Sequence, residues 1–227
     1  TTGSNNTAVG FKAGDKVTTG ANNVFIGADT GNNTTTASAN TYVGHNAGGN
    51  NASGEVNTYI GMNAGANMTT GSYNICLGYA SNSSSNTSTG QCTLGDSNIG
   101  NLRCNDTSIS SLSDERDKTE IVDLPIGIDF INKVRPVKFK WATRDGNIKD
   151  GTYRAGFIAQ ELQSLESSTS VDYLDLVMNT NPDRLEAKEG HLLPVLVKAI
   201  QDLSAENTAL KSLIKGSSSF ASLKSSL

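Results

Sequence analysis

A seventeen-residue repeat runs through the first half of this 227-residue chain and limits what that half can fold into. Each unit contains a glycine, with an apolar residue directly before it and an amide residue four positions before it. A unit this short cannot bury a core alone, so the repeats must stack on one another. The glycines are Gly10, Gly27, Gly44, Gly61, Gly78 and Gly95. The apolar residues are Val9, Ile26, Val43, Ile60, Leu77 and Leu94, and the amides are Asn6, Asn23, Asn40, Asn57, Asn74 and Gln91.

Each repeat predicts a short strand followed by turns. A β-prone run, as at residues 40–44 and 57–61, ends with the apolar residue and the glycine, and Asn, Ser and Thr follow. At about 3.3 Å per extended residue, seventeen residues travel about 56 Å, enough for one turn of a narrow three-sided coil. The repeat pattern therefore predicts that residues 1–97 form an all-β array, with a column of inward apolar side chains and a ladder of hydrogen-bonded asparagines. A β-solenoid and an interwoven trimeric β-prism both satisfy this pattern.

Three aromatic residues, Phe25, Tyr42 and Tyr59, occupy the same position in consecutive repeats. The position is not aromatic in the other repeats, so the stripe is short. We expect it to pack within the array. An exposed surface that stacks on a host glycan is the alternative.

Charge divides the chain into two parts near residue 112. Residues 1–112 contain 8 charged residues, whereas residues 113–227 contain 32. Each part has a net charge of −2, which leaves no basic surface for a nucleic acid backbone or an anionic membrane. No apolar run is long enough to span a bilayer. We therefore expect neither nucleic acid binding nor membrane insertion.

The cysteine and histidine patterns predict no metal site and no cofactor. Cys76, Cys92 and Cys104 form no Cys-x-x-Cys motif, and His45 and His191 are the only histidines. We expect free thiols. The sequence starts without methionine or a signal peptide, so we expect it to be the C-terminal piece of a longer protein.

The second part of the chain predicts a small α+β domain over residues 113–190, after a linker at 98–112. Helical periodicity covers residues 126–134 and stops before Pro136. Residues 137–141 alternate as a strand, residues 144–147 supply a turn into 153–159, and a further helix begins at 160–162.

Residues 191–215 predict a coiled-coil helix. Isoleucine at heptad position a with leucine at d and one asparagine at a favours two strands by the general rule. We expect residues 216–227, which begin with a glycine followed by three serines, to form a flexible tail. Position a is filled by Leu193, Ile200, Asn207 and Ile214, and position d by Leu196, Leu203 and Leu210.

A motif at the boundary between the two parts suggests chemistry. The sequence Ser113-Asp114-x-Arg116-x-Lys118 is followed by Pro-Val-x-Phe-x-Trp at 136–141, by Gly-Phe-Ile-Ala-Gln-Glu-Leu at 156–162, and by the heptad helix. This order resembles the C-terminal intramolecular chaperone of phage tailspikes and tail fibres, which is also a class of self-cleaving peptidases. The repeats resemble those of trimeric viral fibres and, more loosely, the head domains of trimeric bacterial adhesins.

The resemblance implies a homotrimer in which the chaperone assembles the upstream fibre and then cuts itself off. A trimer, rather than the dimer that the heptads alone favour, follows from the resemblance and from the threefold partner that the repeats need. Carried onto this chain, the nucleophile is Ser113, its base is Lys118, and the scissile bond joins Leu112 to Ser113. Asp114 and Arg116 take supporting roles, with Arg116 either beside Lys118 or paired with Asp114.

The chemistry of a serine–lysine pair sets conditions on this site. A lysine acts as a base only where desolvation or a neighbouring cation favours its neutral form. In an α-helix Ser113 and Lys118 would lie about 140° apart, so we expect them to meet across a bend or between subunits. Direct hydrolysis and an N-to-O acyl shift followed by ester hydrolysis are equal options. The same residues also fit an ordinary helix N-cap with a salt bridge.

The resemblance, together with the Ser113–Lys118 motif, implies a single-turnover serine peptidase whose substrate is its own upstream fibre chain. We expect the fibre in the virion and the cleaved chaperone fragment in the host cytoplasm. The alternative is a receptor-binding fibre tip or adhesin that contacts a host-surface glycan or receptor and keeps its trimerisation domain uncut.

Overall fold

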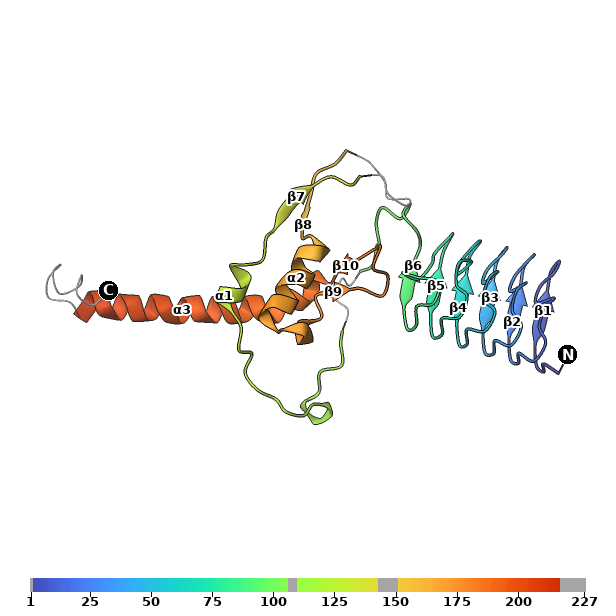
Figure 1. Ribbon diagram of the computed structural model, residues 1–227, viewed down its shortest axis with the longest axis horizontal. Helices are drawn as coiled ribbons and strands as arrows, with labels where there is room; N and C mark the ends of the chain where they lie inside the picture. The colour runs from blue at the N-terminus through green and yellow to red at the C-terminus, as the bar shows by residue number, and fades with distance from the viewer. Residues whose placement is uncertain (1, 106–109, 143–150, 217–227) are drawn as a thin grey trace. The chain divides into compact units, whose positions relative to one another are not determined.

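The computed structural model describes residues 2–105, 110–142 and 151–216, which form two compact units (Figure 1). The predicted turn at 144–147 and the predicted tail beyond Gly216 lie outside the described residues. Unit 1 comprises Thr1–Asn105, Trp141–Gly151 and Thr180–Arg184, and unit 2 comprises Asp106–Lys140, Thr152–Asn179 and Leu185–Leu227.

Unit 1 contains a β-solenoid in which each repeat contributes one strand to a parallel sheet (Figure 1). The strands pair in sequence order, and each residue faces the equivalent residue of the next repeat, as Tyr42 faces Tyr59. Because the paired strands are successive turns of one chain, the solenoid is confirmed and the interwoven prism is wrong. The strands are β1 (Thr7–Val9), β2 (Val24–Ile26), β3 (Thr41–Val43), β4 (Thr58–Ile60), β5 (Ile75–Leu77) and β6 (Cys92–Leu94).

The middle residues of strands β2 to β5 fill the interior of the solenoid. Phe25, Tyr42, Tyr59 and Cys76 have no exposed surface and form one apolar cluster with Met68. The ring centroids of Phe25 and Tyr42 are 5.5 Å apart, and those of Tyr42 and Tyr59 are 4.8 Å apart. The aromatic stripe is therefore internal packing, and these rings are not available to stack on a glycan.

The apolar residue before each glycine lies on the outer side of the sheet. Val9, Ile26, Ile60 and Leu94 are 41–58% exposed. Successive side chains of a strand point to opposite faces, so the residue after an inward ring must point outward. The residue that marks the period in the sequence is thus not the residue that fills the core.

The predicted asparagine ladder is present. Each amide oxygen from Asn6 to Asn74 accepts the backbone N–H of the equivalent residue in the next repeat, at 2.9–3.0 Å. The amide nitrogens of the buried members donate to backbone carbonyls of the following turn. These bonds satisfy polar groups that would be costly to bury unpaired. The fully buried members are Asn23, Asn40, Asn57 and Asn74.

Glycine is required where successive turns of the solenoid approach most closely. At Gly44 the angle φ is +130°, and a Cβ there would lie 2.6 Å from the carbonyl oxygen of Gly61. Only glycine combines this backbone conformation with the missing side chain. This requirement explains why glycine is the most regular residue of the repeat.

Unit 2 is a small α+β unit that includes the C-terminal helix. Its core contains Phe130, Leu162, Leu176 and Val195. Strand β7 pairs antiparallel with β8, and β9 with β10. The elements are the 3₁₀ helices η1 (Glu115–Asp117), η2 (Asp172–Leu174) and η3 (Glu189–Leu192), the α-helices α1 (Ile128–Ile131), α2 (Ala159–Thr169) and α3 (Leu193–Gly216), and the strands β7 (Val137–Phe139), β8 (Arg154–Gly156), β9 (Val177–Met178) and β10 (Glu186–Ala187).

Helix α3 has two apolar faces. Val195 and Ala199 are buried, and Val195 belongs to the core of unit 2. The apolar residues at the predicted a and d positions, from Leu193 to Ile214, are each at least 41% exposed. The heptad face is therefore open along the whole helix in the single chain.

Helix α1 is shorter than the predicted helix at 126–134. Gly127 precedes it and offers no side-chain cap, and Pro136 prevents the helix from continuing. Among the described residues, no helix is long and apolar enough to cross a membrane. That same part of the chain contains no group of three His, Cys, Asp or Glu side chains placed to hold a metal ion, and its three cysteines are free.

Candidate active site

The predicted site lies on an exposed segment, residues 110–123, which we call the arm. Every residue of the arm is exposed, and Leu112 is 98% exposed. The arm contains the short helix η1, which has no buried residue. The peptide bond between Leu112 and Ser113 is therefore open to solvent in the single chain.

Helix η1 brings the two predicted catalytic side chains together. The Nζ of Lys118 donates a hydrogen bond to the Oγ of Ser113 at 2.6 Å and lies 3.4 Å from the carbonyl oxygen of Ser113. Lys118 ends the 3₁₀ turn with an extended backbone, at φ −120° and ψ 145°. The residues thus meet across a bend, which overcomes the separation that a continuous α-helix would impose.

Asp114 and Arg116 pair with each other beside this contact. The Oδ1 of Asp114 accepts the backbone N–H and the Nε–H of Arg116, both at 2.9 Å, and Oδ2 accepts from Nη2 at 2.6 Å. These bonds lower the pKa of the Asp114 carboxyl and raise that of the Arg116 guanidinium. The first of them also caps η1, so the ordinary capping interpretation holds for Asp114 while Ser113 stays free to contact Lys118.

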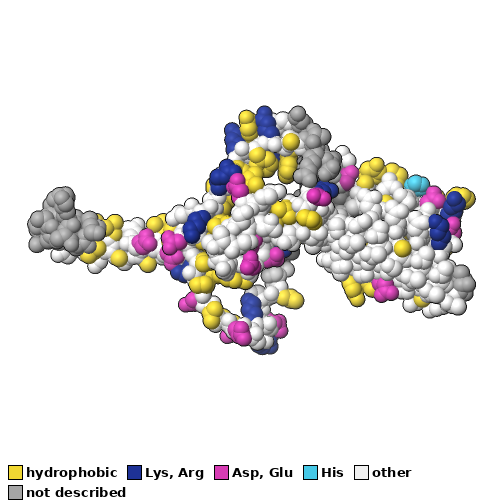
Figure 2. All heavy atoms as spheres, viewed as in Figure 1, with side chains coloured by type: hydrophobic (Ala, Val, Ile, Leu, Met, Phe, Trp, Pro, Cys, Tyr) yellow, Lys and Arg dark blue, Asp and Glu magenta, His cyan; other side chains and the backbone are white. Residues whose placement is uncertain are grey.

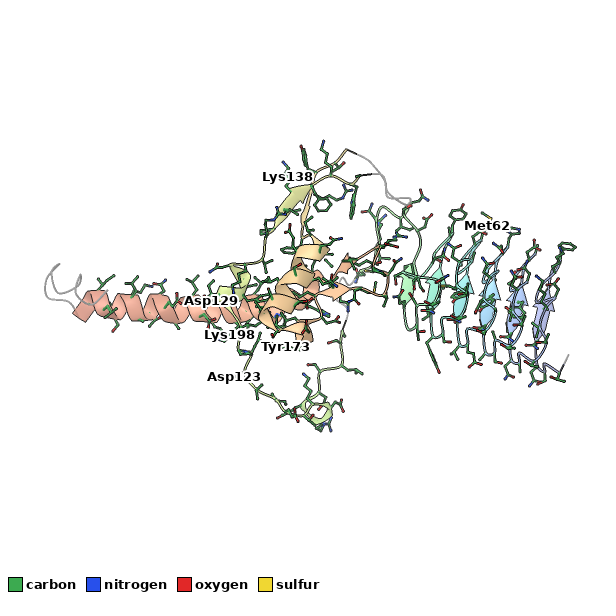
Figure 3. All side chains as sticks on the ribbon, viewed as in Figure 1. Met62, Asp123, Asp129, Lys138, Tyr173 and Lys198 are labelled. Carbon is green, nitrogen blue, oxygen red and sulfur yellow. The ribbon has the colours of Figure 1, made fainter. Side chains whose placement is uncertain are left out.

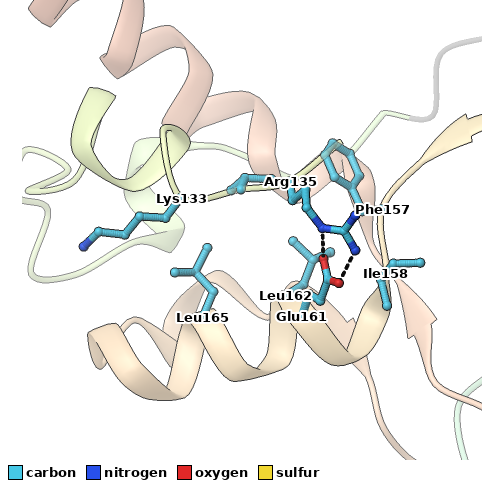
Figure 4. Close-up of a pocket in the computed structure, with 8 residues that line it drawn as sticks. Lys133, Arg135, Phe157, Ile158, Glu161, Leu162 and Leu165 are labelled. Carbon is cyan, nitrogen blue, oxygen red and sulfur yellow. Dashed lines mark hydrogen bonds and ion pairs between the residues drawn. The ribbon is translucent and has the colours of Figure 1, made fainter. Parts of the chain in front are cut away.

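A shallow hollow lies elsewhere in unit 2, between the start of α2 and the segment after α1 (Figure 4). Its lining includes the apolar residues Phe157, Ile158 and Leu162 and the charged residue Lys133. Arg135 crosses the hollow and pairs with Glu161, with Nε 2.9 Å from Oε2. The pairing lowers the pKa of Glu161. None of the predicted catalytic residues lines this hollow.

Two polar contacts of unit 2 were not predicted from the sequence. The carboxylate of Glu166 is buried on α2 and accepts the backbone N–H of Leu176 at 2.7 Å. The Nδ1 of His191 lies 2.9 Å from the carbonyl oxygens of Leu174 and Asp175. Both side chains fix the segment after α2, and neither has a sequence pattern that signals this role.

A group of basic residues around β7 and β8 was also missed. Figure 2 shows Lys and Arg side chains gathered over this hairpin. A charge count within unit 2, rather than over each half of the chain, would have found them. We call this group the basic strip: Lys133, Arg135, Lys138, Lys140 and Arg154, all exposed.

Comparison with known proteins agrees with the resemblance seen in the sequence. The model of a peptidase family, described as "Chaperone of endosialidase", matches residues 113–169. The match begins at Ser113, the serine that Lys118 contacts, and extends to the end of α2. Searches of curated proteins and of solved structures found no match. The chain therefore carries a chaperone-of-endosialidase domain at residues 113–169, preceded by a β-solenoid.

Proposed function

We propose that the C-terminal part is an intramolecular chaperone that trimerises, folds the upstream fibre and then cleaves the bond between Leu112 and Ser113. One observation carries the proposal: the family match starts at Ser113, and Lys118 Nζ lies 2.6 Å from the Oγ of that serine. This hydrogen bond joins two residues of the same chain. Cleavage would then separate the solenoid from the domain that assembled it.

Assembly would proceed through the open face of α3. Its apolar a and d residues lie along one side of the helix and are exposed in the single chain, as expected for a coiled-coil seam before association. Three parallel copies of α3 would hold three solenoids at equal register. Asn207 at an a position would fix that register at some cost in stability.

The cleavage chemistry would start from the serine hydroxyl. Lys118, in its neutral form, takes the proton of Ser113 Oγ while the oxygen attacks the carbonyl carbon of Leu112. In the acyl-shift route, the C–N bond breaks as the Ser113 nitrogen gains a proton, which leaves Leu112 esterified to Oγ. Water then hydrolyses the ester, giving a carboxylate on Leu112 and a hydroxyl and free amine on Ser113. In direct hydrolysis, the Ser113 hydroxyl would hold a water molecule that neutral Lys118 deprotonates, and that water would attack the carbonyl carbon of Leu112 instead.

Cleavage after folding would make assembly irreversible in practice. The separated fibre could not use the chaperone to refold, so its persistence would depend on the rate of unfolding. We place the mature fibre in the virion and the released chaperone fragment in the host cytoplasm.

The test is intact-mass spectrometry of the denatured chain after synthesis. Wild type should give two fragments that meet between Leu112 and Ser113. Ser113→Ala and Lys118→Arg should stay whole while the native mass still shows a trimer, because arginine keeps the charge but cannot act as a base. Ser111→Ala is the matched control and should be cut.

Two results would contradict the proposal. Cleavage of the Ser113→Ala variant at the same bond would exclude the dyad. A wild-type chain that stays whole as a trimer would favour the receptor-binding fibre tip with a permanent trimerisation domain.

A further inference from the structure

The arm carries more acidic than basic charge and is uncovered. Residues 113–123 contain five acidic and two basic residues, a net charge of −3. Its apolar residues Leu112, Ile121 and Val122 are 98%, 63% and 83% exposed. Lysine acts as a base more readily where protein surface excludes water from it. In the single chain no such surface packs against the arm, whose apolar side chains are exposed to solvent. The site is thus incomplete in the single chain.

The basic strip is the electrostatic complement of the arm. Its five members are all basic, and the described residues of 133–142 and 151–158 contain no acidic residue. Lys138 and Lys140 project from the same side of the strand, and their Nζ atoms lie 4.1 and 4.3 Å from the ring centroid of Tyr153. Two ammonium groups over one ring repel each other, and a nearby anionic segment would relieve that repulsion.

The arm and the strip of one chain lie on opposite sides of unit 2. In Figure 3, Lys138 on β7 and Asp123 on the arm are separated by α3 and the helices beside it. An arm that contacts a basic strip would therefore contact the strip of a second copy, which association through α3 would bring close.

We propose that the arm of one copy binds the basic strip of a second copy, and that this contact completes the Ser113–Lys118 site. The inference rests on the proposed function, and it names the basic strip of a second copy as the surface that activates the Ser113–Lys118 site. The neighbour's strip excludes water from Lys118 and brings positive charge near it, and both effects favour the neutral amine that abstracts the serine proton. Lys138 and Lys140 are positioning residues in this arrangement, because they act through the arm.

Charge reversal tests the contact. In timed cell-free translation, the double variant Lys138→Glu/Lys140→Glu should be cut about tenfold more slowly than wild type, because like charges now face each other. Adding Glu120→Lys and Asp123→Lys to the same chain should restore the rate, which a purely structural role of the lysines would not do. An unchanged rate in the first variant, or no recovery in the second, overturns the proposal.

Co-translation of two chains tests the exchange between copies. One chain carries Lys138→Glu/Lys140→Glu with an intact dyad, and the other carries Ser113→Ala with an intact strip. The first chain should be cut in the mixture but only slowly alone, because the second chain supplies the strip. If mixing leaves its cleavage unchanged, the strip does not act between copies.

A cross-link tests the contact without cleavage and so separates the two proposals. In a background of Ser113→Ala, Cys92→Ser and Cys104→Ser, one chain carries Glu120→Cys and the other Lys140→Cys. Oxidation should give a disulfide-linked pair in the mixture and not in either chain alone. Cross-linking with no wild-type cleavage would reject the proposed cleavage but keep the contact. Wild-type cleavage with no cross-link would reject the contact alone.

Discussion

Tyr42 and Tyr59 stack in the solenoid interior with ring planes 7° from parallel, yet their hydroxyl groups have different surroundings. The Tyr42 hydroxyl accepts a hydrogen bond from Asn51 Nδ2. The Tyr59 hydroxyl is buried without a partner of hydrogen-bonding geometry among the described residues, although the Asn74 amide lies near it. Burial raises the pKa of both phenols, so both remain neutral over the ordinary pH range.

The stacked pair predicts opposite responses to loss of a hydroxyl. Tyr42→Phe should lower the free energy of unfolding by about 1–2 kcal/mol, because Asn51 loses an acceptor in a buried site. Tyr59→Phe should leave it unchanged or raise it by up to about 1 kcal/mol, because an unpaired polar group is removed. Urea unfolding of the full chain followed by circular dichroism measures both. Equal losses in the two variants would contradict this assignment.

Val56 is strained by its backbone. Its φ is +57°, in the left-handed region that disfavours β-branched residues, and the equivalent positions of two earlier repeats are Asn5 and Asn22. Val56 is 44% exposed, so little packing depends on it. Val56→Asn should raise the free energy of unfolding by about 1 kcal/mol. Val56→Ala is the control and should gain less in the same denaturation experiment, while a loss in the asparagine variant would refute the strain.

The sequence period predicted the pairing of the solenoid because each turn stacks on an equivalent turn. The face of each strand was harder to assign. Tyr42 and Val43 are both apolar and adjacent, and periodicity alone does not say which of them points inward. The narrow interior holds one column of rings, and Tyr42 fills it while Val43 faces outward. The fit of a flat ring to the narrow interior, rather than a difference in hydrophobicity, therefore explains why Tyr42 points inward.

A sequence motif predicted the candidate site, whereas the short strands β9 and β10 of unit 2 could not be predicted. The contact between Ser113 and Lys118 follows from a local turn, so residues five apart were enough to suggest it. Strands β9 and β10 have two residues each and depend on tertiary contacts such as the one from Glu166 to Leu176. Such short elements leave no periodic signal in the sequence.

We expect the attachment of α3 to α1 to depend on pH through Asp202. Its carboxylate accepts hydrogen bonds from Lys198 and, at 3.4 Å, from the backbone N–H of Ile128. The Lys198 contact first, and the Ile128 contact second, lower the pKa of Asp202 in the folded state. A lowered folded pKa gives stability that is present above the unfolded value of about 3.9 and is lost as pH falls through the folded value.

Asp202→Asn should therefore flatten the acid end of the stability profile. The melting temperature of the wild-type chain should fall between pH 5 and pH 3, and the variant should fall less over that range because it has no carboxylate to protonate there. Glu206→Gln, on the same helix, is the control and should follow wild type. Thermal unfolding at each pH measures the effect, and identical profiles for the Asp202 variant and wild type would exclude this linkage.

Asn207 provides a test of the α3 seam that does not depend on cleavage. It occupies an a position within an exposed apolar stripe, where a trimer would bury its amide. Asn207→Ile in the Ser113→Ala background should stabilise the trimer by about 1 kcal/mol per helix, because an unpaired polar group leaves the seam. Ala205→Ile adds the same side chain at the outer f position and should have little effect on thermal dissociation followed by native mass. If both variants change the dissociation temperature equally, the a and d face of α3 does not form the seam.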